Sequence, residues 1–237
     1  MSPREYRLYH YTSRADYLSD ILRSGFWPRY CAEDFSWIDN GRPLYLMIPM
    51  VCFCDIPIGL SANHKKAYGN YTIGMSKDWG KDIGSCPLLY IYTGSPLATH
   101  LSKIGRKVHA GDFSQEKLGD YAYFLPYLKP VTGYFPDGKH AGPRYTETKD
   151  FDEEMEWRYV PADLIGTIYS EQLFGGGAEI KRRKLNESTK GMRLKFKPEH
   201  VEQIIVQSKG EREAILREFP YYKDRICLWN EIELFGS

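Results

Sequence analysis

The residues best suited to chemistry lie in two segments that are far apart in the sequence. One is Tyr9-His10-Tyr11-Thr12, and the other is Glu153–Arg158, which carries Glu154 and Glu156. A neutral imidazole at a strand end can donate and accept hydrogen bonds near pH 7. A carboxylate accepts a hydrogen bond from a hydroxyl group and stabilises positive charge that develops beside it. A shared site therefore requires a fold that brings the two segments together.

The two glutamates are separated by one residue, so on a strand they would share one face and could act on one ligand. A structural interpretation stands beside this one, because acidic residues are common before a strand and Arg158 can pair with a neighbouring carboxylate. His10 also has a structural alternative, as a histidine bonded to the backbone at a strand end.

Two tyrosines and an arginine are further candidates for holding a ligand. Tyr68 and Tyr71 flank the Gly69-Asn70 turn, and either ring can form a flat pocket wall or belong to the core. Arg29 follows the first predicted helix, where its guanidinium group can contact a diphosphate.

Other motifs give weaker signals. Cys52 and Cys54 with His64 suggest zinc or a thiol nucleophile, but a second ligand pair at zinc spacing is missing and strand cysteines are usually buried and inert. Gly175–Gly177 is not followed by the Gly-Lys-Ser/Thr of a phosphate-binding loop. The Lys181–Lys184 run is either a solvated loop or a contact for a nucleic-acid backbone or an acidic partner.

The composition of the chain excludes some classes of function. In 237 residues, 32 Lys and Arg nearly balance 31 Asp and Glu, so no overall field attracts nucleic acid or membranes. No apolar run is long enough to cross a membrane, and the first residues lack the apolar core of a signal peptide. Five scattered cysteines suit a reducing compartment, so a cytoplasmic location is expected.

The spacing of apolar residues and turn formers predicts one α+β domain over residues 1–237. It begins with a strand at Leu8–Thr12 and a helix at Arg14–Ser24, capped by Ser13 and ended by Gly25. Further helices are expected at Ser61–Tyr68, from Ser95 to Ile104, at Gln115–Tyr127 and at Gly210–Phe219. Further strands are expected at Met50–Asp55, Tyr71–Met75, Leu88–Tyr92, Glu154–Val160, Leu194–Phe196, Val201–Gln207 and Ile226–Leu234. Loops are expected at Cys31–Gly41, at Val131–Lys149 (a long loop or a hairpin) and at Gly175–Gly191.

Several motifs along most of the chain resemble the AbiGi family of abortive phage-resistance proteins. They are His10-Tyr11-Thr12, Ile21-Leu22-x-x-Gly25, Pro49–Pro57, Tyr68-Gly69-x-Tyr71-x-Ile73-Gly74 and Glu156–Pro161, of which Pro49–Pro57 is the most specific. The resemblance implies a role as the antitoxin-like partner of a nucleotidyltransferase-like toxin in a two-gene phage-defence system. The implied partner is a cognate toxin or antitoxin protein.

A wider resemblance links the His-x-Thr strand, the helix after it and the late Glu-Trp-Arg strand to ADP-ribosyltransferases, which carry a His–Tyr–Glu arrangement. It implies two packed antiparallel or mixed sheets with flanking helices, and NAD as the substrate. Breaking the nicotinamide–ribose bond passes through an oxocarbenium-like state, which Glu156 would stabilise while Glu154 positions the acceptor, a nucleic acid or a protein. The residues implied to hold NAD are His10, Tyr11, Thr12, Arg29 and either Tyr68 or Tyr71. The alternative is a non-catalytic antitoxin that binds its toxin.

Overall fold

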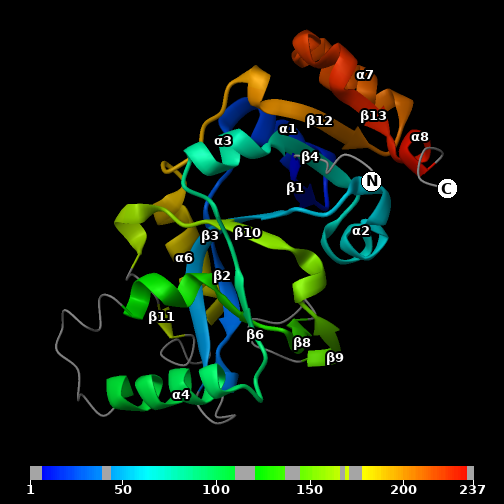
Figure 1. Cartoon of the computed structure of the whole chain (residues 1–237). Helices are drawn as coiled ribbons and strands as arrows, with labels where there is room; N and C mark the ends of the chain where they lie inside the picture. The colour runs from blue at the N-terminus through cyan, green and yellow to red at the C-terminus, as the bar shows by residue number, and fades with distance from the viewer. Residues whose placement is uncertain are drawn as a thin grey trace.

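Strand β3 (Tyr45–Cys54) lies at the centre of the molecule, where it joins the upper and lower parts of the view in Figure 1. Its first half pairs with β2 (Arg29–Asp34), and its second half pairs with β10 (Glu156–Tyr159). Nearly every residue of β3 is buried, which is the pattern of a strand covered on both faces.

The structure, a computed structural model, describes residues 7–38, 44–109, 121–136, 145–165, 169–170 and 178–233. The remaining strands are β1 (Arg7–Thr12), β4 (Tyr71–Ser76), β5 (Cys86–Pro87), β6 (Leu89–Ile91), β7 (Leu128–Pro130), β8 (Thr132–Pro136), β9 (Tyr145–Asp150), β11 (Tyr169–Ser170), β12 (Val201–Val206) and β13 (Ile226–Leu228). The helices are α1 (Ala15–Ser24), α2 (Ala62–Tyr68), α3 (Lys77–Asp82), α4 (Pro96–His109), α6 (Ala178–Thr189), α7 (Lys209–Glu218) and α8 (Trp229–Glu233).

The strands form one mixed sheet and two short pairs. The main order is β13-β12-β4-β1-β3-β10-β5, with β2 and β11 also paired to β3, which makes nine strands. Among the described strands of this sheet, β12 and β13 run parallel and the other pairs are antiparallel. The pairs β6–β7 and β8–β9 lie apart from this sheet. The α+β prediction is confirmed, whereas one large sheet stands where two packed sheets were expected.

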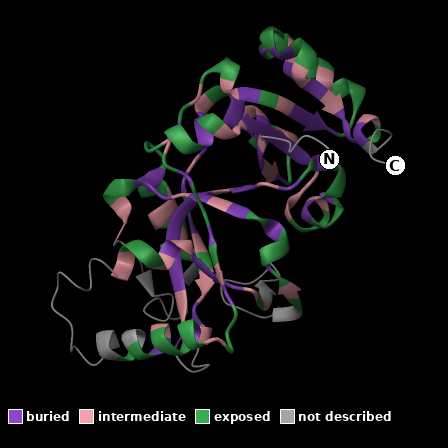
Figure 2. Ribbon diagram, viewed as in Figure 1, coloured by how far each residue is buried: buried purple, intermediate pink, exposed green. Residues whose placement is uncertain are grey.

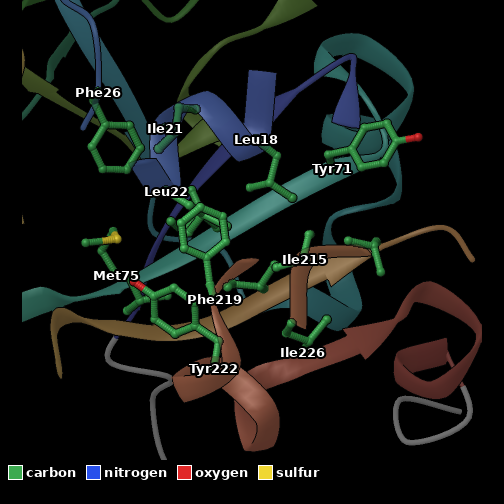
Figure 3. Packing of buried hydrophobic residues seen from close by; sticks show 14 of the residues in the cluster. Leu18, Ile21, Leu22, Phe26, Tyr71, Met75, Ile215, Phe219, Tyr222 and Ile226 are labelled. Atoms are coloured by element: carbon green, nitrogen blue, oxygen red, sulfur yellow. The ribbon is translucent and has the colours of Figure 1, made fainter. Parts of the chain in front are cut away.

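The largest apolar cluster lies between α1, α7 and the strands β4 and β12. Leu18, Ile21 and Leu22 have the i, i+3, i+4 spacing of a helix face. They pack with Ile215 of α7 and with Phe219, the residue that caps α7 (Figure 3). Each such side chain contributes about 1.5–3 kcal/mol when fully buried. Figure 2 shows buried residues continuing along β1, β3 and β4, so these strands form a rigid support.

Helix α1 begins and ends close to the predicted positions, with two differences in detail. Its N-cap is Arg14 rather than Ser13, and the Arg14 guanidinium pairs with Asp16 of the first turn. Tyr17 stands four residues before Ile21, a spacing that predicts burial on the same helix face, yet the residue is 44% exposed. Gly25 ends the helix with φ 86°, and a Cβ there would lie 2.5 Å from the Leu194 carbonyl oxygen. Only glycine fits this close approach of two backbones.

Four sequence predictions differ from the structure because tertiary pairing overrides local composition. The predicted loop at Cys31–Gly41 begins with β2, since the edge of β3 supplies hydrogen-bond partners to a polar segment. Helix α6 occupies much of the predicted loop at Gly175–Gly191, and β13 is followed directly by α8 rather than continuing to Leu234. The strand predicted at Leu194–Phe196 is reduced to one bridge between Leu194 and Phe26.

The middle of the chain is described only in part. The Val131–Lys149 segment forms the hairpin β8–β9, which was one of the two options. The first part of the helix predicted at Gln115–Tyr127 (residues 115–120) and all of Gly175–Gly177 lie outside the described residues, whereas residues 121–127 are helical and end in a 3-10 turn.

Candidate functional site

A cavity of about 700 Å³ lies where β1 separates from β3. The structure brings seven of the eight predicted site residues to its walls: His10, Tyr11, Thr12, Arg29, Tyr68, Glu154 and Glu156. This volume is in the range of small-molecule sites, which span about 300–1,000 Å³. Segments from both ends of the sequence therefore meet at one concave surface.

His10 is positioned by the point at which two strands part. Tyr9 is opposite Cys54, but no register pair between β1 and β3 follows, and the Nδ1 atom of His10 instead lies 2.8 Å from the Cys52 carbonyl oxygen. The imidazole thus satisfies a backbone acceptor that the ladder leaves open. Burial lowers the pKa of His10 against the opposing effect of that bond. A neutral ring that donates from Nδ1 keeps Nε2 as an acceptor.

The two carboxylates reach the cavity by different backbone routes. Glu156 is the first residue of β10, whereas Glu154 ends a short 3-10 turn at Asp152–Glu154 and is outside the strand. Between them Met155 has φ 43°, a left-handed conformation that few non-glycine residues adopt. The shared strand face predicted for the two glutamates is therefore wrong, and the turn at Met155 directs both inward.

Both carboxylates belong to a buried network of ion pairs. Lys129 of β7 contacts Glu154 at 3.0 Å and Glu156 at 2.7 Å. Arg158 donates to Glu156 at 2.7 Å and 3.2 Å, and its Nη2 lies 3.0 Å from Glu33. The Arg158 side chain has no solvent exposure. The pairing of Arg158 with a neighbouring carboxylate, which the sequence left open, is thus present.

Glu154 has a second set of donors on its other oxygen. Tyr68 donates its hydroxyl to Glu154 Oε1 at 2.5 Å, and Lys149 lies 2.5 Å from the same atom. The side chain of Glu154 is 2% exposed. A carboxylate held by three donors on two oxygens has little freedom to move, so Glu154 is a fixed part of the wall.

The network keeps its members charged. Burial alone would raise the pKa of Glu156, yet Arg158 and Lys129 outweigh that effect and hold its pKa far below the usual range. The pKa of Glu154 is lowered in the same way, chiefly by Lys129. Burial would lower the pKa of Lys129, but its carboxylate neighbours, Glu156 first, keep it well above normal. The cavity floor is therefore ionic at neutral pH.

Tyr71 does not line the cavity, although it is only three residues from Tyr68. It packs in the apolar cluster under α1 and α7, and its hydroxyl donates to Glu211 at 2.6 Å. The turn is fixed by Gly69, whose φ is 124° and whose Cβ would lie 2.4 Å from the Thr12 carbonyl oxygen. Of the two predicted tyrosines, Tyr68 alone belongs to the site.

Arg29 lies at a more open part of the cavity. It is exposed at the start of β2, and its guanidinium carbon is 4.3 Å from the centre of the Trp27 ring. Such a cation–π contact orients the guanidinium group without neutralising its charge.

The two alternatives built on cysteine gain no support. Burial raises the pKa of Cys54 to about 12 and the pKa of Cys52 well above normal, so neither thiol is an activated nucleophile. His64 packs against the rings of Tyr11 and Tyr68. Among the residues that the structure describes, no group of three or more His, Cys, Asp and Glu could hold a metal ion.

Sequence reasoning missed two cations of this site and left the role of a third open. Lys129 and Lys149 were given no role, and Arg158 was considered only as a local partner. One signal was present: Lys129 stands between Leu128 and Pro130 in an apolar segment, where a lone charge needs a buried partner. The partner itself could not be identified, because the β7 to β10 contact depends on the tertiary fold.

Fold and cavity together define an α+β protein with a mixed sheet and a charged cavity at its centre. No solved structure matches the chain. The family model described as "Putative abortive phage resistance protein AbiGi, antitoxin" matches residues 24–207. The chain is 26% identical over 215 residues to the abortive phage resistance protein AbiGi of Lactococcus lactis subsp. cremoris. The match covers 81% of this chain and 86% of that protein.

The chain therefore belongs to the AbiGi family, and the family assigns it to abortive phage resistance. In the described part of the chain, no helix is both long and apolar enough to span a bilayer.

Proposed function

We propose that the cavity binds NAD and that the protein transfers ADP-ribose from it to a macromolecular acceptor during phage defence. One observation carries the proposal: His10 of β1, Tyr68 at the end of α2 and Glu156 of β10 line the same cavity. These are the three residue types that the resemblance to ADP-ribosyltransferases requires, drawn from three separate parts of the chain.

The cavity contains groups suited to both ends of a dinucleotide. The Nε2 atom of His10 accepts a hydrogen bond from a ribose hydroxyl, because Nδ1 is already used. The ring of Tyr68 offers a flat wall for nicotinamide, and its hydroxyl is held by Glu154. Aromatic and polar groups fixed in this way need little reordering when a ligand binds.

Glu156 has the properties needed next to the reacting ribose. In the reaction, the bond between the nicotinamide nitrogen and ribose C1′ breaks, and the electron pair leaves with nicotinamide. C1′ gains positive charge until an acceptor nucleophile forms the new bond and gives its proton to water. A carboxylate kept ionised by Arg158 and Lys129 stabilises that charge.

Glu156 also has room for one more donor. Of the roughly four acceptor positions of a carboxylate, three receive N–H groups of Lys129 and Arg158. The fourth position faces the Cys52 thiol, which donates a hydrogen bond to Glu156. Burial raises the pKa of this thiol most, and Glu156 raises it further. A thiol is a weak donor, so a ribose hydroxyl can displace it.

The test is nicotinamide release from NAD by the purified chain, with bacterial lysate as the source of acceptor. We expect release from the wild type, and at least a hundredfold less from Glu156→Asp, which keeps the charge but withdraws it by one methylene. Glu211→Gln is the control, because the Glu211 carboxylate is also hydrogen-bonded but lies outside the cavity. Equal release by Glu156→Asp and Glu211→Gln, or none by the wild type, would contradict the proposal.

A second function is favoured by the word "antitoxin" in the description of the family model. In that case the chain neutralises a cognate toxin by direct contact and needs no chemistry at Glu156. Co-expression with the product of a neighbouring gene would then give a stable complex, and Glu156→Asp would protect cells as well as the wild type does. Loss of protection in a variant that still forms the complex would exclude this function.

A further inference from the structure

The wall of the cavity next to α6 carries a cluster of positive charge that the proposed chemistry does not use. Residues 178–195 contain seven Lys and Arg but only two Glu, in a chain whose net charge is +1. Two of these cations, Arg182 and Arg193, line the cavity together with Arg29 of β2. This one segment beside the cavity therefore carries a local excess of five positive charges (seven minus two).

Helix α6 is fixed against β2 by contacts from one face. The Tyr30 backbone N–H donates to Asn186 Oδ1 at 2.8 Å, and Trp27 Nε1 donates to Thr189 Oγ1 at 3.0 Å. Arg182 precedes Asn186 by one helical turn, so the two side chains lie on the same face. The packing of α6 thus sets the position of Arg182 relative to the cavity, whereas a lysine on a loop would be free to move.

Electrostatic coupling also places Arg182 near the buried network. Burial raises the pKa of Cys31 to about 11, while Arg158 and Arg182 act against that rise. Cys31 therefore lies within reach of one arginine of the network and one of α6. The charge of Arg182 extends the positive side of the network toward solvent.

The arginines differ in whether their charge is already used. Arg193 bonds Asp20 at 2.8 Å and the Gly25 carbonyl at 3.0 Å. Within the described residues, neither Arg29 nor Arg182 has a carboxylate within ion-pair distance. In the adjoining buried network, Lys129, Lys149 and Arg158 all have carboxylate partners. Two forked donors with unused charge are thus left on one wall.

Trp27 holds this wall in place. Arg29 lies 4.3 Å from the centre of its ring and Arg193 lies 5.2 Å from it. Because the ring is also tied to α6 through Thr189, the start of β2 and the helix keep a fixed separation. Guanidinium groups fixed on two elements match the oxygens of a diphosphate, which accept several charge-assisted hydrogen bonds.

We propose that Arg29 and Arg182 form the phosphate-binding end of the cavity and hold the diphosphate of a nucleotide whose sugar points toward Glu156. The inference rests on the proposed function for the class of ligand, and it adds a second arginine and an orientation. It assigns a role to α6, which the Lys181–Lys184 run alone could not define, since Arg182 lines the cavity and Arg183 does not.

The test compares ADP with adenosine by titration calorimetry of the full chain. We expect ADP to bind at least about tenfold more tightly than adenosine, and Arg182→Gln and Arg29→Gln each to weaken ADP binding by at least about tenfold. Adenosine binding should not change. Arg183→Gln is the matched control, because it removes the same charge from an exposed neighbour on α6.

Three results would overturn the proposal. One is that Arg182→Gln and Arg183→Gln weaken ADP binding equally, which would indicate attraction by the overall positive charge of α6. Another is ADP binding no tighter than adenosine. A third is a short single-stranded DNA whose binding is weakened by both substitutions while ADP is unaffected, which would make α6 a nucleic-acid surface.

The same variants separate this inference from the proposed NAD chemistry. If ADP binding depends on Arg182 but no nicotinamide is released from NAD, the phosphate site stands and the transferase reaction fails. If release occurs with the same KM for NAD in wild type, Arg29→Gln and Arg182→Gln, the reaction stands and the phosphate site fails.

Discussion

The cavity and the apolar cluster under α1 and α7 are neighbouring regions held together by different forces. In the apolar cluster, residues such as Leu18 and Phe219 are stabilised by burial, which has no direction. In the cavity, Arg158 and Lys129 hold two carboxylates through directed ion pairs. The polar wall of the cavity therefore depends on each of its ion-pair partners, whereas the apolar cluster tolerates changes of side-chain shape.

The largest effect on stability is expected when the buried network of ion pairs loses a central member. Arg158→Met leaves Glu156 and Glu33 without their shared cation, so we expect a loss of about 3–5 kcal/mol in the free energy of unfolding. Arg193→Met, which removes a pair with the half-exposed Asp20, should lose about 1 kcal/mol or less. Urea unfolding of both variants measures the difference, and equal losses would show that the network does not support the fold.

The second effect concerns acid. Burial lowers the pKa of His64 to about 4, against an unfolded value near 6.5, so the unfolded state binds more protons between these values. Stability should therefore fall by on the order of 3 kcal/mol as the pH drops from about 6.5 to 4. Glu154 and Glu156, with lowered pKa values, add a further loss only below about 4.5.

Urea unfolding at a series of pH values checks this dependence, with His64→Phe as the comparison. That variant should lose much of the slope above pH 4.5, while His10, whose pKa burial also lowers, still contributes. If His64→Phe leaves the slope unchanged, the pH dependence of stability arises from groups other than His64.

The third prediction separates the two tyrosines on either side of the Gly69-Asn70 turn. Tyr68→Leu removes the ring proposed to stack on nicotinamide, so NAD should bind about tenfold more weakly, as expected for stacking worth about 1–3 kcal/mol. Tyr71→Leu should lower stability but leave NAD affinity unchanged, because its ring lies in the apolar cluster. Calorimetric titration decides, and equal affinities for the two variants would remove Tyr68 from the site.

The smallest effect is expected at Met155, whose backbone directs both carboxylates inward. Met155→Gly should change stability by less than about 1 kcal/mol, because glycine adopts this φ without strain. Met155→Val places a β-branched residue at a positive φ and should lose about 1–3 kcal/mol. Thermal unfolding measures both, and a harmless valine would mean that the turn can adopt another conformation.

Much of the local structure could be predicted from sequence because it depends on neighbouring residues. The α1 helix follows from apolar spacing and Gly25, and β12 follows from Val201–Val206. The strand β2 could not be predicted, since its polar residues form a strand only against the edge of β3. Helix α6 was missed for a similar reason: its contacts with Trp27 and Tyr30 come from the other end of the chain.

The candidate site divides in the same way. His10, Tyr68 and Glu156 could be selected by residue type and by resemblance, but the cations that surround them could not. Neutralising Glu156 would leave Arg158 and Lys129 buried without the charge that they pair with. For this reason Glu156→Asp is a better probe than Glu156→Gln.

The most direct test of the central claim is calorimetric titration of the wild-type chain with NAD. We expect one saturable site per chain, at which ADP competes with NAD, together with a rise in melting temperature. The absence of binding heat together with an unchanged melting temperature at millimolar NAD would contradict this claim, and would leave contact with a cognate toxin as the function to pursue.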